Sequence, residues 1–100
     1  MTKREKMPDG ADLGASVRSL RKQKKLTIEE LAHIVDIHTT YLSKIERGRG
    51  NPSWKIIIGF ADAFDLSLVA FAQYVEGITR AREGYELVVQ DVEKRTGLKL

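Results

Sequence analysis

The feature that most constrains the fold is a helix start signal at residues 27–30, directly in front of an apolar stripe. These residues read Thr-Ile-Glu-Glu, which is a capping box: the Thr27 hydroxyl accepts from the backbone N–H of Glu30, and the Glu30 carboxylate accepts from the backbone N–H of Thr27. The stripe behind the box predicts a helix over residues 28–35. Asp36 follows, and Asp tolerates the left-handed conformation that a sharp turn needs. A short helix followed by a tight turn is therefore expected.

Similar signals recur along the chain and predict further short helices. Apolar residues at spacings of three and four indicate helices over about 13–24 behind Asp12, over 39–47 before Gly48, from Ser53 through Phe64, and from Ser67 through Ala72. Gly59 lies inside one of these helices, where glycine costs about 1 kcal/mol relative to alanine, so a packing reason for it is expected. The sequence thus predicts an all-α chain of five short helices.

The last quarter of the chain carries more apolar residues than a five-helix domain needs. Beyond Gly84 these residues fit a helical stripe that ends at Gly97, and they are Tyr85, Val88, Val89 and Val92. Tyr85, Leu87 and Val89 also fit the alternation of a strand, because β-forming residues are crowded there. A helix is the favoured prediction and a strand is the alternative. The surplus of apolar surface predicts that residues 74–100 form a dimerisation element, or a surface for another protein.

Length and composition bound the class of protein. One hundred residues without cysteine form one domain, since two would each be too small for a core. The lack of cysteine excludes disulfide frameworks, thiolate zinc sites and cysteine nucleophiles, and fits a reducing compartment. The polar start lacks the apolar core of a secretory signal, and no stretch approaches the roughly 20 apolar residues that span a bilayer. A cytoplasmic protein without membrane contact is expected, with residues 1–12 as a flexible N-terminal arm.

Positive charge is concentrated in one part of the chain. The net charge of the whole chain is only +3, which by itself does not indicate a nucleic-acid partner. Residues 13–54, however, hold eight basic and four acidic residues, so this segment alone has a surplus of +4 and the remainder is slightly acidic. A locally basic segment favours an acidic partner such as DNA.

Two short helices joined by a tight turn form a helix-turn-helix unit, whose second helix enters the major groove of DNA. The run from Leu26 to Gly48, with Asn51-Pro52-Ser53 behind it, resembles the Cro/C1-type (XRE-family) helix-turn-helix regulators. The agreement extends over about 13–72. Apolar residues occupy the family's packing positions, and they are Leu31, Ala32, Ile37, Leu42 and Ile45. The resemblance implies a lambda-repressor-like fold of five helices, with residues 13–73 as the DNA-binding domain.

Two positions depart from the family pattern. The family usually has Gln at the start of the second helix, where its side chain clamps a phosphate or braces a recognition side chain, but this chain has Ile28. That side-chain contact is therefore not implied here, although the backbone N–H groups at the helix start can still meet a phosphate. The family often has Gly in the turn, where this chain has Asp36. The expected fold is unchanged, whereas the details of DNA contact are affected.

The outer face of residues 39–47 has the chemistry of a base-reading helix. Leu42 and Ile45 point inward at i and i+3, and the other side carries short polar residues and cations but no acid. Short side chains let a helix lie close to base edges, where Lys can donate to guanine and Thr can contact the thymine methyl. The predicted base-reading residues are Thr39, Thr40, Ser43 and Lys44.

Other residues near this helix are expected to hold the DNA backbone. Phosphate contacts position a protein without reading sequence, and this role is predicted for Tyr41, Arg47, Arg49 and Asn51. Glu46 is out of place among so many phosphate contacts. The resemblance implies that Glu46 forms a structural ion pair with Arg21 of the first helix and so orients the recognition helix.

The sequence offers no pattern for catalysis or for a cofactor. His33 and His38 are separated by about 140° around a helix, and no third ligand is near, so a metal site is not predicted. We find no Gly-rich phosphate loop, nucleophile elbow or metal-ligand spacing. An enzyme, a cofactor and a small-molecule ligand are therefore not expected. Trp54 is expected to pack in the core or in an interface.

These observations predict a sequence-specific transcriptional regulator, most simply a repressor, that binds double-stranded DNA as a homodimer on a palindromic operator. Its half-sites would lie about one helical turn, roughly 34 Å, apart. The alternative is an antitoxin or adaptor module whose main partner is another protein. In that case residues 74–100 would bind the partner and DNA binding would be secondary.

Overall fold

The computed structural model describes residues 10–97, apart from the side chains of Tyr85 and Val88. Within this range the chain forms five helices: α1 (Gly10–Gln23), α2 (Ile28–Val35), α3 (Thr39–Glu46), α4 (Trp54–Ala63) and α5 (Leu68–Thr96). The described residues contain no strand, so the predicted all-α fold of five helices is confirmed. Residues 1–9 of the expected N-terminal arm and residues 98–100 of the expected C-terminal extension lie outside the described range.

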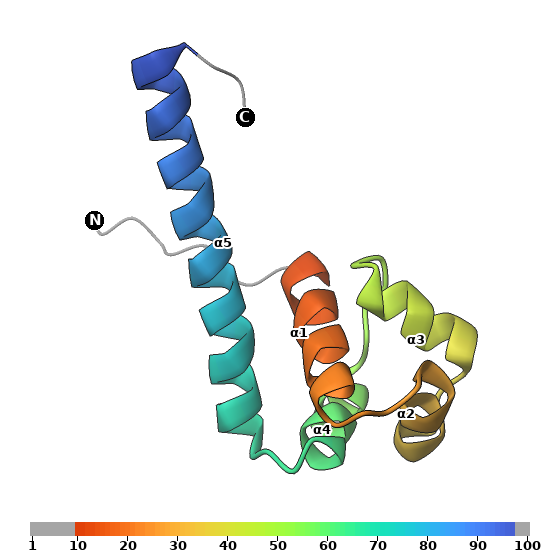
Figure 1. The fold of residues 1–100 in the computed structure, drawn as a ribbon. Helices are drawn as coiled ribbons and strands as arrows, with labels where there is room; N and C mark the ends of the chain where they lie inside the picture. The colour runs from red at the N-terminus through yellow and green to blue at the C-terminus, as the bar shows by residue number, and fades with distance from the viewer. Residues whose placement is uncertain (1–9, 98–100) are drawn as a thin grey trace.

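Helices α1 to α4 and the first half of α5 enclose one hydrophobic core (Figure 1). Its centre holds three phenylalanine rings that contact one another in a row: the ring centroids of Phe60 and Phe64 lie 6.4 Å apart, and those of Phe64 and Phe71 lie 6.1 Å apart. These separations are typical of aromatic pairs. Leu42 and Ile45 are fully buried against this core, so α3 is seated on it by the two residues that its periodicity selects.

The helix ends follow the sequence signals closely. In the capping box, Thr27 N donates to Glu30 Oε1 at 2.9 Å and Glu30 N donates to Thr27 Oγ1 at 3.0 Å. Asp36 has a φ of 60°, so the expected left-handed turn after α2 is confirmed. Ser53 and Ser67 cap α4 and α5 through their hydroxyls, as predicted.

The start of α1 differs from the prediction. The helix begins at Gly10, so Asp12 lies inside the first turn, and the prediction that it caps the helix is wrong. The Asp12 side chain is 2% exposed and accepts two hydrogen bonds of 2.9 Å from Arg82 of α5. A partner 70 positions away leaves no local signal, and a lone Asp before an apolar stripe therefore has the same pattern as a cap.

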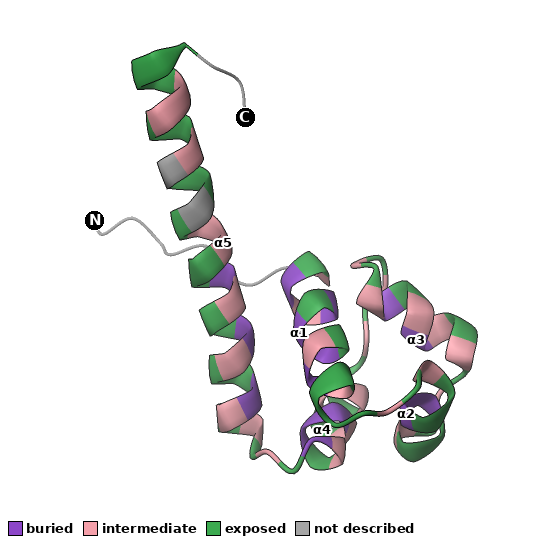
Figure 2. Cartoon of the chain, in the orientation of Figure 1, coloured by how far each residue is buried: buried purple, intermediate pink, exposed green. Residues whose placement is uncertain are grey.

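Helix α5 is one uninterrupted helix of 29 residues. It continues through Gly84, so the helical prediction for the last quarter of the chain is confirmed and the strand alternative is wrong. Phe71, Val75 and Thr79 are buried, whereas no described residue of α5 beyond Thr79 is fully buried. The second half of the helix extends past the core, where every position whose burial is described is intermediate or exposed (Figure 2).

Among the described residues, no single helix is both long enough and apolar enough to cross a membrane. Helices α4 and α5 meet that length and composition only when they are joined across a bend of 94°.

Two expectations for α4 have different outcomes. A Cβ at Gly59 would lie 3.1 Å from Cγ1 of Val35 in α2, so the packing reason for this glycine is confirmed. Trp54, the first residue of α4, is 65% exposed, so a place for it in the core is wrong. Its alternative role in an interface stays a prediction.

Candidate nucleic-acid interface

Helix α3 lies on one side of the molecule, away from α5, and packs against α1 and α2 (Figure 1). Leu42 and Ile45 fix the inner side of the helix. The four predicted base-reading residues share its other side, and all are exposed or partly exposed: Thr39, Thr40, Ser43 and Lys44. The structure therefore brings these four side chains together on one accessible helix face.

The start of α3 is fixed by a residue that sequence reasoning missed. His38 is the N-cap, and its Nδ1 accepts a hydrogen bond from the backbone N–H of Thr40 at 3.1 Å. Sequence reasoning considered His38 only as a possible metal ligand and predicted no metal site. The described residues contain no group of three potential ligands that could hold a metal ion. The available signal was its position directly before the first turn, but His is not among the usual N-cap residues.

Three cations lie in the second half of α3 and the loop behind it. Lys44, Arg47 and Arg49 are all exposed. Within residues 10–97, none of the three takes part in an ion pair. Their positive charge is therefore not neutralised inside the protein, which is the arrangement that attracts a polyanion. Asn51 lies in the same loop and is also exposed.

Tyr41 has an intermediate position. Tyr41 is half-buried and packs against the hydrophobic core. The packing of the ring fixes the side chain at the edge of the base-reading face. The contact between its hydroxyl and a phosphate stays a prediction.

Arg21 and Glu46 are brought together, as the resemblance implies. Arg21 Nε donates to Glu46 Oε2 at 2.7 Å and Arg21 Nη2 donates to Glu46 Oε1 at 3.1 Å. The two side chains are only 12% and 4% exposed, and a bidentate pair of this kind is among the stronger hydrogen-bonded contacts in proteins. Arg21 Nη1 also donates to the carbonyl of Leu26 at 2.9 Å. One guanidinium thus joins the last residue of α3 to α1 and to the loop before α2.

The end of α3 also meets α1 through backbone contact. Gly48 has a φ of 80°, and a Cβ added to it would lie 2.9 Å from Cα of Ala11. The predicted helix stop is therefore also a point of close approach between the loop after α3 and the first turn of α1. The sequence indicates the stop but contains no sign of the contact, because Ala11 belongs to a part of α1 that was not predicted to be helical.

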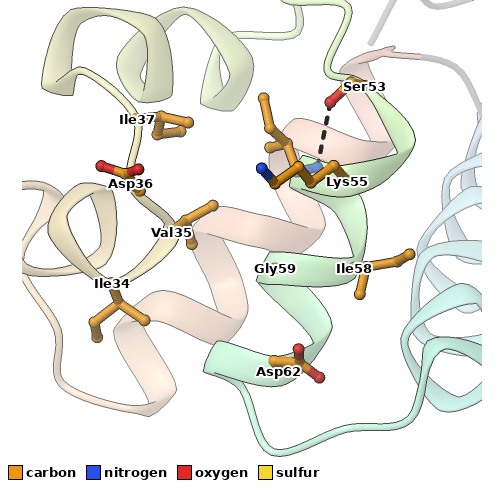
Figure 3. Close-up of a pocket in the computed structure, with 10 residues that line it drawn as sticks. Ile34, Val35, Asp36, Ile37, Ser53, Lys55, Ile58, Gly59 and Asp62 are labelled. Carbon is orange, nitrogen blue, oxygen red and sulfur yellow. Dashed lines mark hydrogen bonds between the residues drawn. The ribbon is translucent and has the colours of Figure 1, made fainter.

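A hollow of about 460 Å³ opens between the end of α2 and the outer side of α4 (Figure 3). Aliphatic side chains form much of its lining, and Ile34 and Ile58 are 52% and 41% exposed. Charged side chains stand at separate places around the rim (Figure 3), and they are Asp36, Lys55 and Asp62. The Ser53 hydroxyl accepts from the backbone N–H of Ile56 as the cap of α4. The hollow is therefore an apolar surface feature, without the converging polar groups of a catalytic site.

Comparison with protein families and with known sequences gives consistent matches. The family model described as helix-turn-helix matches residues 17–71. The chain is 42% identical over 62 residues to the ImmF control region 10 kDa protein of Bacillus phage phi105, an alignment that covers 62% of this chain and 69% of that protein. It is 34% identical over 85 residues to the HTH-type transcriptional repressor RghR of Bacillus subtilis (strain 168), covering 81% of this chain and 63% of that protein. The chain thus spans about two thirds of the length of these relatives.

Among solved structures, the chain is similar to the clp gene regulator ClgR from Corynebacterium glutamicum. The two superpose with a TM-score of 0.83 at 27% sequence identity, over 89% of this chain and 95% of the other. This coverage exceeds the segment that the family model matches, so the structural likeness extends beyond the helix-turn-helix unit.

Proposed function

The chain belongs to the helix-turn-helix family, and we propose that it is a transcriptional regulator, most simply a repressor, that binds specific sites on double-stranded DNA. Members of this family are DNA-binding regulators and the chain is not an enzyme. The observation that carries the proposal is the accessible face of α3, where short polar side chains lie beside Lys44, Arg47 and Arg49. Such a face can approach base edges and phosphates together.

The residues on and around this face have two proposed roles, base recognition and phosphate contact. We assign base reading to Thr39, Thr40, Ser43 and Lys44, because they share the exposed side of α3. Phosphate holding is assigned to Tyr41, Arg47, Arg49 and Asn51, which surround that side at its edge and in the following loop. The Arg21–Glu46 pair contacts no DNA in this proposal and orients α3.

The proposed regulator is a homodimer formed through the second half of α5. Val89 and Val92 lie eighteen residues beyond Phe71 and Tyr74, which is about five full helical turns, so they point to the side of α5 that faces the core further back. Beyond the end of the core, the described residues of the same chain do not fully cover this side of α5, because Val89 and Val92 remain partly exposed. A second copy of the same helix would bury both stripes with one two-fold contact.

A two-fold dimer implies a two-fold operator. The proposed operator is palindromic, with half-sites about one helical turn, roughly 34 Å, apart. Because several phosphates would be neutralised, affinity should fall steeply with rising salt.

The specificity of binding is tested by selection from random duplexes at physiological salt, with the full chain and with Lys44→Ala. An enriched two-fold motif is expected, and Lys44→Ala should relax the preference at one position of each half-site. Lys22→Ala is the matched control, because Lys22 is exposed on α1, outside the proposed interface. Failure to enrich any motif would contradict the proposal of sequence-specific binding. Uniform weakening by Lys44→Ala would indicate that Lys44 contacts a phosphate and not a base.

The dimer is tested by sedimentation of Val89→Glu and Leu87→Glu. Leu87 is 67% exposed and lies about 200° around the helix from Val89, so the two variants place the same charge on opposite sides of α5. Val89→Glu should give a monomer, whereas Leu87→Glu should stay dimeric. Equal behaviour of the two variants would place the dimer contact elsewhere.

The second candidate is an antitoxin or adaptor module with a protein partner. The apolar side of α5 around Val89 and Val92 suits a foreign helix as well as a second copy. Under this alternative, the purified chain would be a monomer at micromolar concentration, and Val89→Glu would leave DNA affinity unchanged. Under the favoured proposal the same substitution weakens operator binding sharply, because one bound half-site no longer assists the other.

A further inference from the structure

We propose that Asp12 and Arg82 are positioning residues that set the distance between half-sites accepted by the dimer. This inference rests on the proposed function, since it takes the dimer contact on α5 and the reading face on α3 as its two ends. The Asp12–Arg82 pair holds the first turn of α1 to α5 at the point where α5 leaves the core. It thereby fixes the angle at which the projecting half of α5 stands relative to α3.

Helix α5 is tied to α1 at two points. Near its start, the hydroxyls of Ser19 and Tyr74 share a hydrogen bond of 2.8 Å. Eight residues further on, about 12 Å along the helix, Arg82 Nε and Nη2 each donate to the Asp12 carboxylate at 2.9 Å. A rod that is attached at two separated points cannot pivot about either of them. Releasing the second attachment leaves α5 held by the Ser19–Tyr74 bond and by its buried residues Phe71, Val75 and Thr79, so that the part beyond Thr79 can tilt relative to α1.

The Asp12–Arg82 pair is built as a durable contact. Asp12 is 2% exposed, while the Arg82 side chain is 32% exposed and also donates to Glu86 at 3.2 Å. The hydrogen bond to Asp12 raises the pKa of Arg82 above its ordinary value, and arginine is charged over the whole physiological pH range in any case. Two parallel N–H···O bonds fix direction as well as distance. The pair is therefore suited to hold an angle.

Helix α1 also holds the recognition helix, through contacts near both of its ends. Arg21 binds Glu46 at the end of α3 with a bidentate contact, and Gly48 meets Ala11 without room for a Cβ. Both α3 and α5 are therefore fixed in position by their contacts with α1. An angle fixed between α1 and α5 is also fixed between the reading face and the dimer contact.

The length of the projecting helix converts a small tilt into a change of register on DNA. From Arg82 to Thr96, α5 extends by about 21 Å, so a tilt of roughly 10° moves its far end by about 4 Å. One base-pair step is about 3.4 Å. Each step also turns the half-site by about 34–36° around the DNA axis, because 10–10.5 base pairs complete one turn. A loosened angle in each protomer therefore lets the two reading faces reach half-sites that differ in spacing by about one step, through tilt and rotation of the outer half of α5 together.

The test measures affinity against half-site spacing. The probes are duplexes that carry the selected half-sites at the natural spacing and at spacings changed by one or two base pairs, and binding of the full chain is followed by fluorescence anisotropy. The wild-type protein should lose about tenfold in affinity per changed base pair, roughly one mismatched contact. Arg82→Met should bind all spacings within about threefold of one another, which is less than the cost of one mismatched base pair, with an unchanged preference for bases within each half-site. Lys24→Met is the control, because Lys24 forms an exposed pair with Asp65, and its spacing profile should equal that of the wild type.

Arg82→Lys keeps the charge but loses the bidentate contact, so its profile should fall between those of the wild type and Arg82→Met. It also decides the case in which Arg82→Met does not fold, since a Lys variant with the wild-type profile overturns the inference. A spacing profile of Arg82→Met equal to that of the wild type overturns it as well. If the wild-type protein itself shows no spacing preference, the proposed dimeric function fails together with it. A steep wild-type profile that both Arg82 variants retain defeats the positioning role alone.

Discussion

Gly14 of α1 lies against the carbonyl oxygen of Glu46, so that a Cβ at Gly14 would come within 2.7 Å of that oxygen and closer still to the carbonyl oxygen of Ile45. Both neighbours are backbone atoms at the end of α3, and neither can turn aside as a flexible side chain can. The fit of the recognition helix on α1 therefore depends on a missing methyl group.

Gly14→Ala should be destabilising by about 1–3 kcal/mol, because an extra methyl in a filled contact forces the backbone apart. Since the displaced element is α3, the variant should also bind operator DNA more weakly at temperatures where it remains folded. Urea unfolding and anisotropy measure the two effects. Normal stability with normal DNA binding would contradict the close approach of the two helices.

Gly77→Ala should have the opposite sign. Gly77 is exposed within α5, and a Cβ there would meet no atom within 4 Å. Glycine inside a helix costs about 0.5–1 kcal/mol relative to alanine, so the substitution should stabilise the protein by that amount. Urea unfolding at constant protein concentration checks it, and a loss of stability would mean that an undetected contact covers this side of α5.

Arg21→Met should be destabilising by about 3–5 kcal/mol, because it leaves the Glu46 carboxylate buried without its partner. The matched control is Lys24→Met: Lys24 and Asp65 form a pair at 3.3 Å with side chains that are 43% and 84% exposed. Exposed pairs contribute about 0–1 kcal/mol, so the control should change little. Thermal and urea unfolding of both variants compare the two pairs directly, and similar losses would contradict the difference in burial.

Asp36→Gly should stabilise the protein by up to about 1 kcal/mol, because Asp36 has a φ of 60°, a conformation that glycine adopts without the penalty of a Cβ. Asp36→Val should be destabilising at the same position, since a β-branched residue is poorly tolerated there. The two variants bracket the wild type in urea unfolding. A stabilising Val would contradict the left-handed turn.

Arg47→Ala should weaken DNA binding to about the same extent for every sequence and should reduce the slope of log affinity against log salt by about 1. The reason is that Arg47 is exposed at the end of α3 and belongs to no ion pair within residues 10–97. Affinity measured at several salt concentrations, on the selected operator and on an unrelated duplex, checks the prediction. A loss confined to the selected operator would make Arg47 a base-reading residue.

The sequence predicts those parts of the fold that depend on local chemistry. Thr27 and Glu30 are three residues apart, so their reciprocal cap is visible in the sequence, and the left-handed turn at Asp36 is visible for the same reason. Asp12 is the contrasting case, because its role is set by Arg82 at the other end of the chain. The place of a single apolar residue also could not be predicted: Trp54 was expected to pack in the core or in an interface, and it is exposed in this chain.

The candidate site follows the same division. The face formed by Thr40 and Lys44 can be predicted from helical spacing, and Glu46 could be paired with Arg21 only through a family resemblance. The cap at His38 and the backbone contact of Gly48 with Ala11 were missed. Histidine is not one of the usual N-cap residues, and a contact between residues far apart in the chain leaves no local pattern, so neither feature could be predicted from this sequence alone.

The continuity of α5 has a consequence for how the protein responds to its own abundance. Phe71 and Val75 near the start of this helix belong to the hydrophobic core, while Val89 and Val92 lie beyond it. A partner that orders the outer half of a helix also disfavours unravelling of its inner half, so association and folding would be linked by mass action. The melting temperature would then rise with protein concentration, and dilute protein would lose stability and DNA affinity together. Such linkage makes occupancy of an operator a steeper function of abundance than binding by a rigid monomer allows.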